Sequence, residues 1–208
     1  MTSHKQTALF SRHQRMGARM TDHDGWQTAA SFTSPREEMA RVTASAGLAD
    51  VSWMTKVDLK GAGVNTLAAL DARSRSWALG PAHLLVTCDP DARDSLLAQV
   101  TSAAGVSVTE VTSVFAQIVL AGPHGRDILR KLTSLNVSEA ALPDLSCGQT
   151  TLAHVRGSIL LRQDLGRLPA FHILVGRDYG EDVWDSLLHA GHEFDLAPFG
   201  LEAFEALL

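Results

Sequence analysis

The chain has 208 residues, of which 45% are hydrophobic, and a formal net charge of -5 at pH 7. This length is enough to bury one sizeable hydrophobic core, or a core plus a smaller appended lobe, and one principal domain is the default expectation. The weakly acidic balance and the absence of Lys/Arg runs argue against nucleic acid and membrane surfaces as partners. Proteins or small molecules are the partner classes that remain.

The two cysteines and the N-terminus indicate where the protein resides. Cys88 and Cys147 have no CxxC spacing, which argues against a disulfide scaffold or a thiolate metal site and suits a reducing compartment. Residues 1–20 lack the apolar centre of a signal peptide, and no later stretch has the length of a membrane span. The sequence therefore predicts a cytoplasmic protein.

The clearest local signal is a helix start at Ser34-Pro35-Arg36-Glu37, which has a cap, an N1 proline and a capping-box glutamate. We expect this helix to end near Ala46, with Gly47 as its left-handed closing residue. The alternation of apolar and polar residues from Val51 to Leu59 then predicts a half-buried strand.

The middle of the chain predicts strands and helices in mixed order. Residues 62–76 have weak periodicity and are expected to form a short helix or a loop. Further strands are expected at 83–88, 106–111 and 114–120, with helices opening at Asp89-Pro90 and Gly122-Pro123.

The last third of the chain predicts strands at 150–155, 158–162 and 170–175, followed by a helix at 179–189. Strands that are adjacent in sequence, with few long helical crossovers, favour antiparallel or mixed sheets covered by helices. The predicted fold class is therefore α+β. We expect one module over residues 1–208 with an N-terminal arm at 1–33.

Two local groupings have both a functional and a structural interpretation. His189 and His192, with Glu193 beside them, have the residue types of a metal site, but the helix should end between them, so we favour a solvated helix end. Residues 122–125 (Gly-Pro-His-Gly) match no phosphate-binding motif, so we favour a close-packing turn over an anion site.

The sequence contains no complete catalytic set. No Gly-x-Ser-x-Gly elbow is present, and Cys88 has the position of a small buried hydrophobe at a strand end. Asp22, Asp24 and Trp26 have the types expected of polar recognition beside an aromatic platform. We favour an N-terminal loop held on the core by its tryptophan.

Two blocks of the sequence resemble the folate-dependent aminomethyltransferase family, which includes the glycine-cleavage T-protein and related subunits of heterotetrameric sarcosine oxidase. The first block, His13 to Lys60, contains Gly17-Ala18-Arg19-Met20-Thr21-Asp22, Gly25-Trp26 and Ala46-Gly47-Leu48-Ala49-Asp50-Val51-Ser52-Trp53-Met54-Thr55-Lys56. The second block, His83 to Gly200, is most similar to the sarcosine oxidase gamma subunit and contains Leu120-Ala121-Gly122-Pro123, Cys147-Gly148-Gln149-Thr150, Val183-Trp184-Asp185-Ser186-Leu187-Leu188 and, at its end, Pro198-Phe199-Gly200-Leu201-Glu202-Ala203.

The resemblance also identifies what the chain lacks. The segment 62–81 has no counterpart of the family's paired aspartates, since Asp71 is an isolated acid, and residues 164–171 have no counterpart of its pteridine-binding glutamate. The C-terminal barrel of the family is not part of the sequence. The catalytic carboxylate is therefore expected to be missing.

Two hypotheses follow. The first is a non-catalytic subunit resembling the sarcosine oxidase gamma subunit, assembled with a larger oxidase-like partner that carries flavin and folate. The second is a stand-alone tetrahydrofolate-binding protein or aminomethyltransferase, completed across a homodimer, with Asp22, Trp26, Asp50 and Met54 as cofactor-binding residues. A fragment whose motifs serve only packing is the third alternative. No catalytic or metal-ligating residue is predicted.

Overall fold

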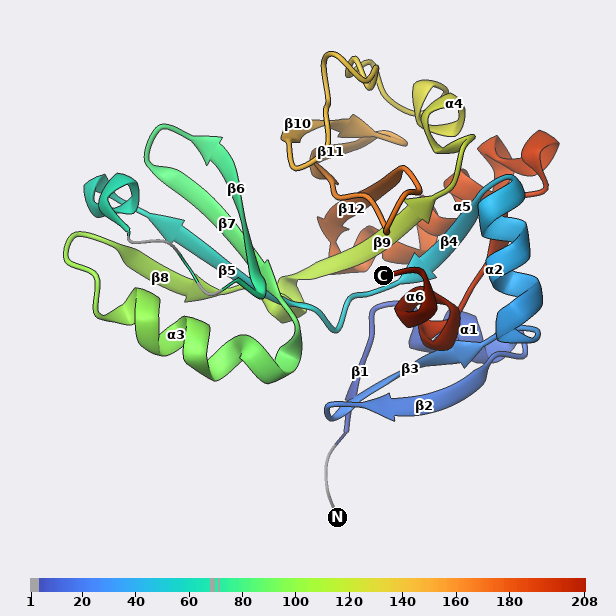
Figure 1. The fold of residues 1–208 in the computed structure, drawn as a ribbon, viewed down its shortest axis with the longest axis horizontal. Coiled ribbons are helices and arrows are strands. Elements are labelled where there is room, and N and C mark those ends of the chain that lie inside the picture. Colours follow the sequence, from blue (N-terminus) through green and yellow to red (C-terminus); the bar gives the residue numbers. More distant parts are fainter. Residues whose placement is uncertain (1–3, 68–69, 71) are drawn as a thin grey trace. The chain divides into compact units, whose positions relative to one another are not determined.

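The computed structural model describes residues 4–67, 70 and 72–208 (Figure 1). The chain divides into two compact units, one comprising residues up to Ser52 together with Phe115–Leu208, and the other Trp53–Val114. This division is a finding that the sequence pattern did not indicate. Among the described residues, no helix is long and apolar enough to cross a bilayer.

The N-terminal part of the first unit is a small sheet with one short helix. It contains β1 (Lys5–Gln6), α1 (Phe10–Arg15), β2 (Arg19–His23) and β3 (Trp26–Ser31). The strand order is β1-β3-β2, with β1 parallel and β2 antiparallel to β3. The expected arm is thus built of regular elements, and β2 and β3 are joined by a tight hairpin.

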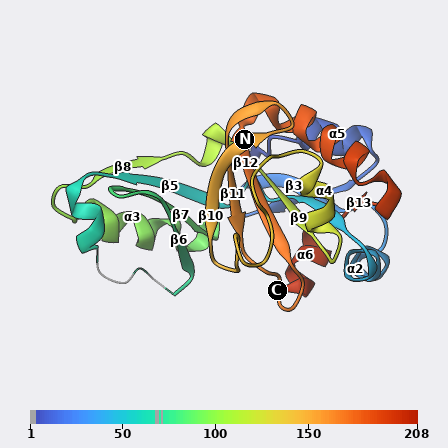
Figure 2. The same cartoon turned by 90° about the horizontal axis from the view of Figure 1, so that it is seen from above.

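The main sheet of the first unit has six strands in the order β10-β11-β12-β9-β4-β13. All neighbours are antiparallel except β13 and β4, and Figure 2 shows β10, β11, β12 and β9 side by side. The strands are β4 (Gly47–Asp50), β9 (Phe115–Ala121), β10 (Cys147–Leu152), β11 (Val155–Arg162), β12 (Ala170–Gly176) and β13 (Ala197–Pro198). The remaining helical elements of the unit are α2 (Pro35–Ala44), α4 (Gly125–Arg130), η4 (Arg177–Tyr179), α5 (Gly180–Ala190), η5 (His192–Phe194) and α6 (Leu201–Leu207).

The core of this unit lies between the main sheet and α5. Ile118 and Leu120 of β9 and Ile173 of β12 project to the face on which Val183 and Trp184 pack, and all five side chains are buried. The alternation of strand side chains sends the intervening residues to the opposite face. The predicted amphipathic helix near residues 179–189 is confirmed, since its apolar stripe faces this sheet.

Helix α2 begins as predicted, and its capping box is complete. The Ser34 hydroxyl accepts a hydrogen bond from the Glu37 backbone N–H, and the Glu37 carboxylate accepts one from the Ser34 backbone N–H. Glu38, which is buried, accepts hydrogen bonds from the backbone N–H groups of Phe32 and Gly200, at 2.5 and 2.8 Å. The carboxylate thereby ties α2 to both the segment after β3 and the start of α6.

Gly47 does not have the predicted left-handed conformation, because it is the first residue of β4. A Cβ at this position would lie 2.4 Å from Val42 Cγ2 and 2.7 Å from Phe199 Cδ1. The glycine is therefore explained by close packing of α2 and the Phe199 ring on the strand, and not by helix termination.

The second unit is a four-stranded antiparallel sheet, in the order β6-β7-β5-β8, with one helix on it (Figure 1). Leu96 and Val100 of the helix pack against Val57, Leu59 and Val86 of the sheet. Its elements are β5 (Thr55–Lys60), η1 (Ala62–Thr66), β6 (Ser74–Gly80), β7 (His83–Cys88), η2 (Pro90–Ala92), α3 (Arg93–Thr101), β8 (Ser107–Glu110) and η3 (Thr112–Val114).

Three predicted element boundaries are wrong. The strand predicted at 51–59 begins only at Thr55, because β4 ends at Asp50 and the buried residues between them form a turn. Residues 74–76, which were predicted as the end of a short helix or loop, belong to β6. The strand predicted at 150–155 is interrupted by Ala153 and His154, whose positive φ values form a turn without glycine. The α+β class with antiparallel and mixed sheets is confirmed.

Candidate functional site

Asp22 and Trp26, two of the predicted cofactor-binding residues, lie at the β2–β3 hairpin. Trp26 is buried, and Lys5 Nζ lies 5.2 Å from its ring centroid. Asp22 accepts hydrogen bonds from Gly25 N–H at 3.1 Å and from His4 Nδ1 at 2.7 Å, and these bonds lower the pKa of the carboxyl. Both side chains therefore hold the hairpin, and their role toward a cofactor stays a prediction.

Asp50, the third predicted residue, ends β4 and is buried with a side chain only 1% exposed. Its Oδ1 accepts hydrogen bonds from both Ser52 N–H at 3.0 Å and the Ser52 hydroxyl at 2.5 Å. Its Oδ2 accepts a longer bond, 3.4 Å, from the N–H of Leu9, the residue that caps α1. The carboxylate thus fastens α1 to the main sheet.

His13 is the buried titratable group beside this carboxylate, and sequence reasoning did not single it out. Its Nδ1 lies 3.9 Å from Asp50 Oδ2, and its ring meets Phe32 and Trp184 edge-on, with centroids 5.2 and 5.1 Å away. Neither ring nitrogen makes a hydrogen bond to a described residue. Burial lowers the pKa of His13, opposed by the Asp50 charge, so the imidazole is neutral near pH 7.

A second buried polar pair lies on the main sheet. Gln117 of β9 and His172 of β12 are on neighbouring strands, with Gln117 Nε2 and His172 Nδ1 2.9 Å apart. The Gln117 N–H donates to the Ser52 hydroxyl at 3.0 Å. Successive polar contacts thus run from His13 to Asp50, Ser52 and Gln117, and end at His172. We call these five residues the buried polar cluster.

The buried polar cluster offers acceptors and neutral donors but no activated nucleophile. A carboxylate, two imidazoles, an amide and a hydroxyl can position or hydrogen-bond a ligand, and the serine hydroxyl donates to the Asp50 carboxylate at 2.5 Å. Among the described residues, no three His, Cys, Asp or Glu side chains could hold a metal ion.

The two cysteines do not supply a nucleophile at neutral pH. Burial raises the pKa of Cys88 to about 11, and burial also raises the pKa of Cys147. The reactive form of a cysteine is the thiolate, which is scarce when the pKa is raised. The interpretation of Cys88 as a small buried hydrophobe is confirmed, because the residue is 1% exposed in the core of the second unit.

Met54, the fourth predicted residue, is the second residue of the second unit and is buried. Its carbonyl accepts a hydrogen bond at 2.7 Å from Nζ of Lys56, a lysine that is wholly buried. Asp50 and Met54 belong to different units, and Asp71 lies outside the described residues. Whether Met54 contacts a cofactor stays a prediction.

The segment where the family resemblance places a pteridine-binding glutamate contains one acid, Asp164. Its two carboxylate oxygens accept hydrogen bonds from Arg162 Nε and Nη2, at 2.6 and 2.9 Å, and from Ala170 N–H at 3.1 Å. The Arg162 side chain is only 3% exposed and lies over the Phe171 ring. This acid is therefore neutralised and held by its own chain.

Residues 122–125 (Gly-Pro-His-Gly) form the close-packing turn that the sequence favours. Gly122 has φ +116°, and a Cβ there would lie 2.5 Å from Ser45 O and 2.8 Å from Ala46 Cα. The His124 N–H donates to the Ser45 carbonyl at 3.2 Å, which holds the turn against the end of α2. The His124 N–H is thus bonded within the protein, and the turn packs closely against the end of α2.

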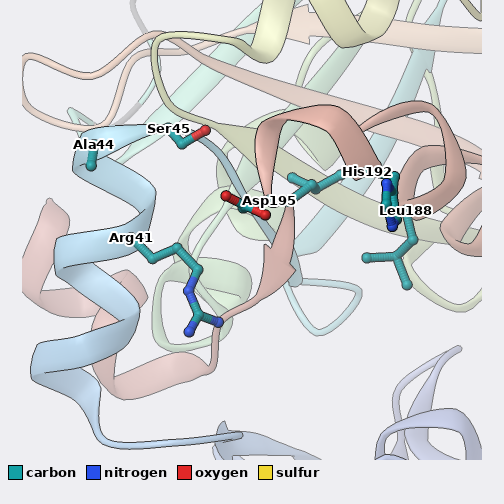
Figure 3. A pocket seen from close by; sticks show the side chains of 7 residues that line it. Arg41, Ala44, Ser45, Leu188, His192 and Asp195 are labelled. Atoms are coloured by element: carbon teal, nitrogen blue, oxygen red, sulfur yellow. The ribbon is translucent and has the colours of Figure 1, made fainter.

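A surface pocket of about 680 Å³ lies where α2 ends, beside the segment that follows α5 (Figure 3). It is lined by Arg41 of α2, by Ser45 directly after that helix, by Leu188 of α5, and by His192 and Asp195 of the segment that follows α5. Of the predicted histidine pair, only His192 lines this pocket. No sequence motif indicated it, because its walls come from segments about 150 residues apart.

The fold and this set of residues define a class, namely an α+β module with antiparallel and mixed sheets and a buried polar cluster on its main sheet. A model of the GCVT N-terminal domain matches residues 76–207, and the chain belongs to that family. The resemblance seen in the sequence is thereby confirmed.

Curated relatives agree with this assignment. The aminomethyltransferases of Acidobacterium capsulatum and Moorella thermoacetica are each 26% identical to the chain and cover 98% and 100% of it. Sarcosine oxidase subunit alpha of Corynebacterium sp. is 27% identical over 97% of the chain, which corresponds to 25% of that subunit. The chain spans about three fifths of the length of the two aminomethyltransferases, 61% and 64%.

Solved structures show the same fold. Glycine cleavage system aminomethyltransferase T from Bartonella henselae aligns with a TM-score of 0.80 at 17% identity, covering 98% of this chain and 61% of that one. A chain of heterotetrameric sarcosine oxidase from Corynebacterium sp. U-96 aligns with a TM-score of 0.62 at 19% identity, covering 78% of this chain and 95% of that one.

Proposed function

We propose that the chain is a non-catalytic subunit resembling the gamma subunit of sarcosine oxidase. In this role it assembles with a larger oxidase-like partner that carries flavin and folate, in the one-carbon metabolism of sarcosine or another N-methyl amine. Catalysis then belongs to the partner, and this chain supplies a folded surface for assembly.

The observation that carries the proposal is the engagement of Asp164. A buried pteridine needs a fixed acceptor for its ring N–H and amino donors, since each unpaired buried donor costs about 1 to 3 kcal/mol. In the corresponding segment, Asp164 already accepts from Arg162 and from the Ala170 backbone. Recruiting it to a pteridine would leave the buried guanidinium of Arg162 without its strongest partner.

Chain size supports the same role. The alignment with the sarcosine oxidase chain covers 95% of that chain, whereas only 61% of aminomethyltransferase T is covered. An oxidase complex of several chains thus contains one that this fold matches almost end to end. The low identity limits this support to the fold.

A tetrahydrofolate titration of the isolated protein tests the proposal. Trp26 and Trp53 are the reporters, because both are buried near the residues predicted to bind the cofactor. We expect no saturable change in tryptophan fluorescence up to about 1 mM ligand. Saturable quenching in that range would contradict the proposal.

The alternative function is a stand-alone tetrahydrofolate-binding protein or aminomethyltransferase, completed across a homodimer. It is favoured by the aminomethyltransferase relatives, which align over the whole chain, including the hairpin with Asp22 and Trp26. If the titration gives saturable quenching, Trp26→Phe locates the ligand. Loss of the fluorescence quenching, with the affinity measured by calorimetry unchanged, would place the pteridine near this ring.

A further inference from the structure

We propose that the pocket at the end of α2 binds an amino-acid zwitterion with an apolar side chain. The pocket is lined by Arg41, Ala44, Ser45, Leu188, His192, Asp195 and Leu196, all of which belong to the first compact unit. Its volume, about 680 Å³, falls within the range of small-molecule sites, roughly 300 to 1,000 Å³. This site is separate from the buried polar cluster and from Asp164.

The pocket contains one cationic and one anionic side chain that do not pair with each other. Arg41 and Asp195 are exposed, and neither makes a side-chain hydrogen bond or an ion pair to a described residue, although the Arg41 charge helps to lower the pKa of Glu37 and most other charged side chains of this unit are paired. Figure 3 shows the Asp195 carboxylate between α2, which carries Arg41, and the segment with His192. A ligand that carries both charges can satisfy both groups at once.

The ligand class follows from the charges and the apolar wall. A simple anion would be attracted by Arg41 but repelled by Asp195. A simple cation would be attracted by Asp195 but repelled by Arg41. A zwitterion avoids both penalties, with its carboxylate toward the guanidinium and its ammonium toward Asp195. Leu188, Leu196 and Ala44 then form the apolar wall on which a side chain can pack.

The backbone segments that carry the two charged side chains are hydrogen-bonded to each other. The Ser45 hydroxyl, at the end of α2, donates to the Phe194 carbonyl at 2.5 Å, directly before Asp195. Asp195 has a left-handed backbone, with φ 51° and ψ 34°, and its N–H donates to the His192 carbonyl. The turn is closed by a bond from Leu196 N–H to Gly191 O at 3.2 Å. A pre-formed site loses little conformational freedom when a ligand binds.

The test is calorimetric or NMR titration of the full chain with L-leucine and two matched compounds. 4-Methylpentanoate lacks the ammonium group, and 3-methylbutylamine lacks the carboxylate. We expect saturable binding of L-leucine with a Kd on the order of 1 mM or below, and affinities at least about tenfold weaker for both analogues. Equal affinity for L-leucine and 4-methylpentanoate, or no saturable binding of L-leucine, would overturn the proposal.

Two substitutions assign the charges. Arg41→Gln and Asp195→Asn should each weaken L-leucine binding about tenfold or more, and asparagine tolerates the left-handed backbone at residue 195. The control is Arg36→Gln, which removes an exposed arginine of the same helix that does not line the pocket. Unchanged affinity in both pocket variants, with native circular dichroism, would contradict the site.

Discussion

Two acidic residues in segments that resemble the family are held by contacts within the chain. Asp50 lies in a run that resembles the aminomethyltransferase family, and its carboxylate holds Ser52 and Leu9, the N-cap residue of α1. Asp164 lies in the segment where the family has an acid for its ligand, and Arg162 holds it. Each acid is explained by contacts within the chain.

The Asp164–Arg162 pair should be a strong contributor to stability. Asp164→Ala removes the two short bonds to the buried guanidinium, which of its ion pairs to described residues keeps only the longer one to Glu139 at 3.4 Å, so the free energy of unfolding should fall by about 2 kcal/mol. Urea unfolding followed by circular dichroism measures this. The control is Asp178→Ala, an exposed acid with no side-chain hydrogen bond to a described residue, for which a change within about 0.5 kcal/mol is expected. Similar losses in the two variants would contradict the buried-pair account.

Gly122 should be far less replaceable than another glycine with positive φ. Gly122→Ala brings a Cβ within 2.6 Å of two backbone oxygens of α2 and the residue after it, in addition to the unfavourable φ. The expected loss is about 2 to 5 kcal/mol. Gly157, with φ +73° and nothing within 4 Å of the added Cβ, provides the matched control. Gly157→Ala should cost only about 1 to 2 kcal/mol, and equal losses would refute the packing explanation.

At the scale of elements, what the sequence could predict depended on whether the signal was local. The start of α2 was predictable because its capping box lies within four residues. The short elements α1, β1 and α6 were not, because they have two to seven residues each and exist through contacts with distant strands. Such elements have little periodicity to detect and are stabilised by tertiary packing.

In the candidate site, too, local sequence signals were predictable and contacts between distant residues were not. Asp50 could be selected from a motif, but the Leu9 N–H that it accepts lies 41 residues away in sequence. His13 escaped notice because a lone histidine in a six-residue helix has no diagnostic spacing. The pocket joins residues 41–45 to residues 188–196, and only the fold brings these segments together. Pairing across such distances is set by the sheet order and not by local pattern.

Helix α1 should make the stability of the protein depend on pH through His13. Burial lowers the pKa of this histidine below its ordinary value of 6.5, so the unfolded chain takes up the proton more readily than the folded chain. The free energy of unfolding should therefore fall as pH decreases below about 6.5, and this contribution should be constant at higher pH.

Urea unfolding at several pH values between about 5.5 and 7.5 measures this effect. His13→Gln should reduce the slope of stability against pH in this range, because the buried titrating group is gone. His189→Gln, which removes an exposed histidine at the end of α5, is the control and should leave the slope unchanged. An identical slope in wild type and His13→Gln would assign the dependence to other groups.

At the scale of the whole molecule, the fold class and the family were within reach of the sequence, and the division into two compact units was not. The two units are built from alternating strands and one or more covering helices, so composition and periodicity do not distinguish them. The proposed role as an assembly subunit concerns surfaces, and surfaces carry little sequence pattern.

The most direct test of the proposed role is native mass spectrometry of the tagged chain purified from its own host, together with its absorption spectrum. The proposal predicts that the 22.3 kDa chain is recovered in a stoichiometric complex with larger subunits and that the complex has flavin absorbance. Recovery only as a monomer or homodimer without flavin would contradict it.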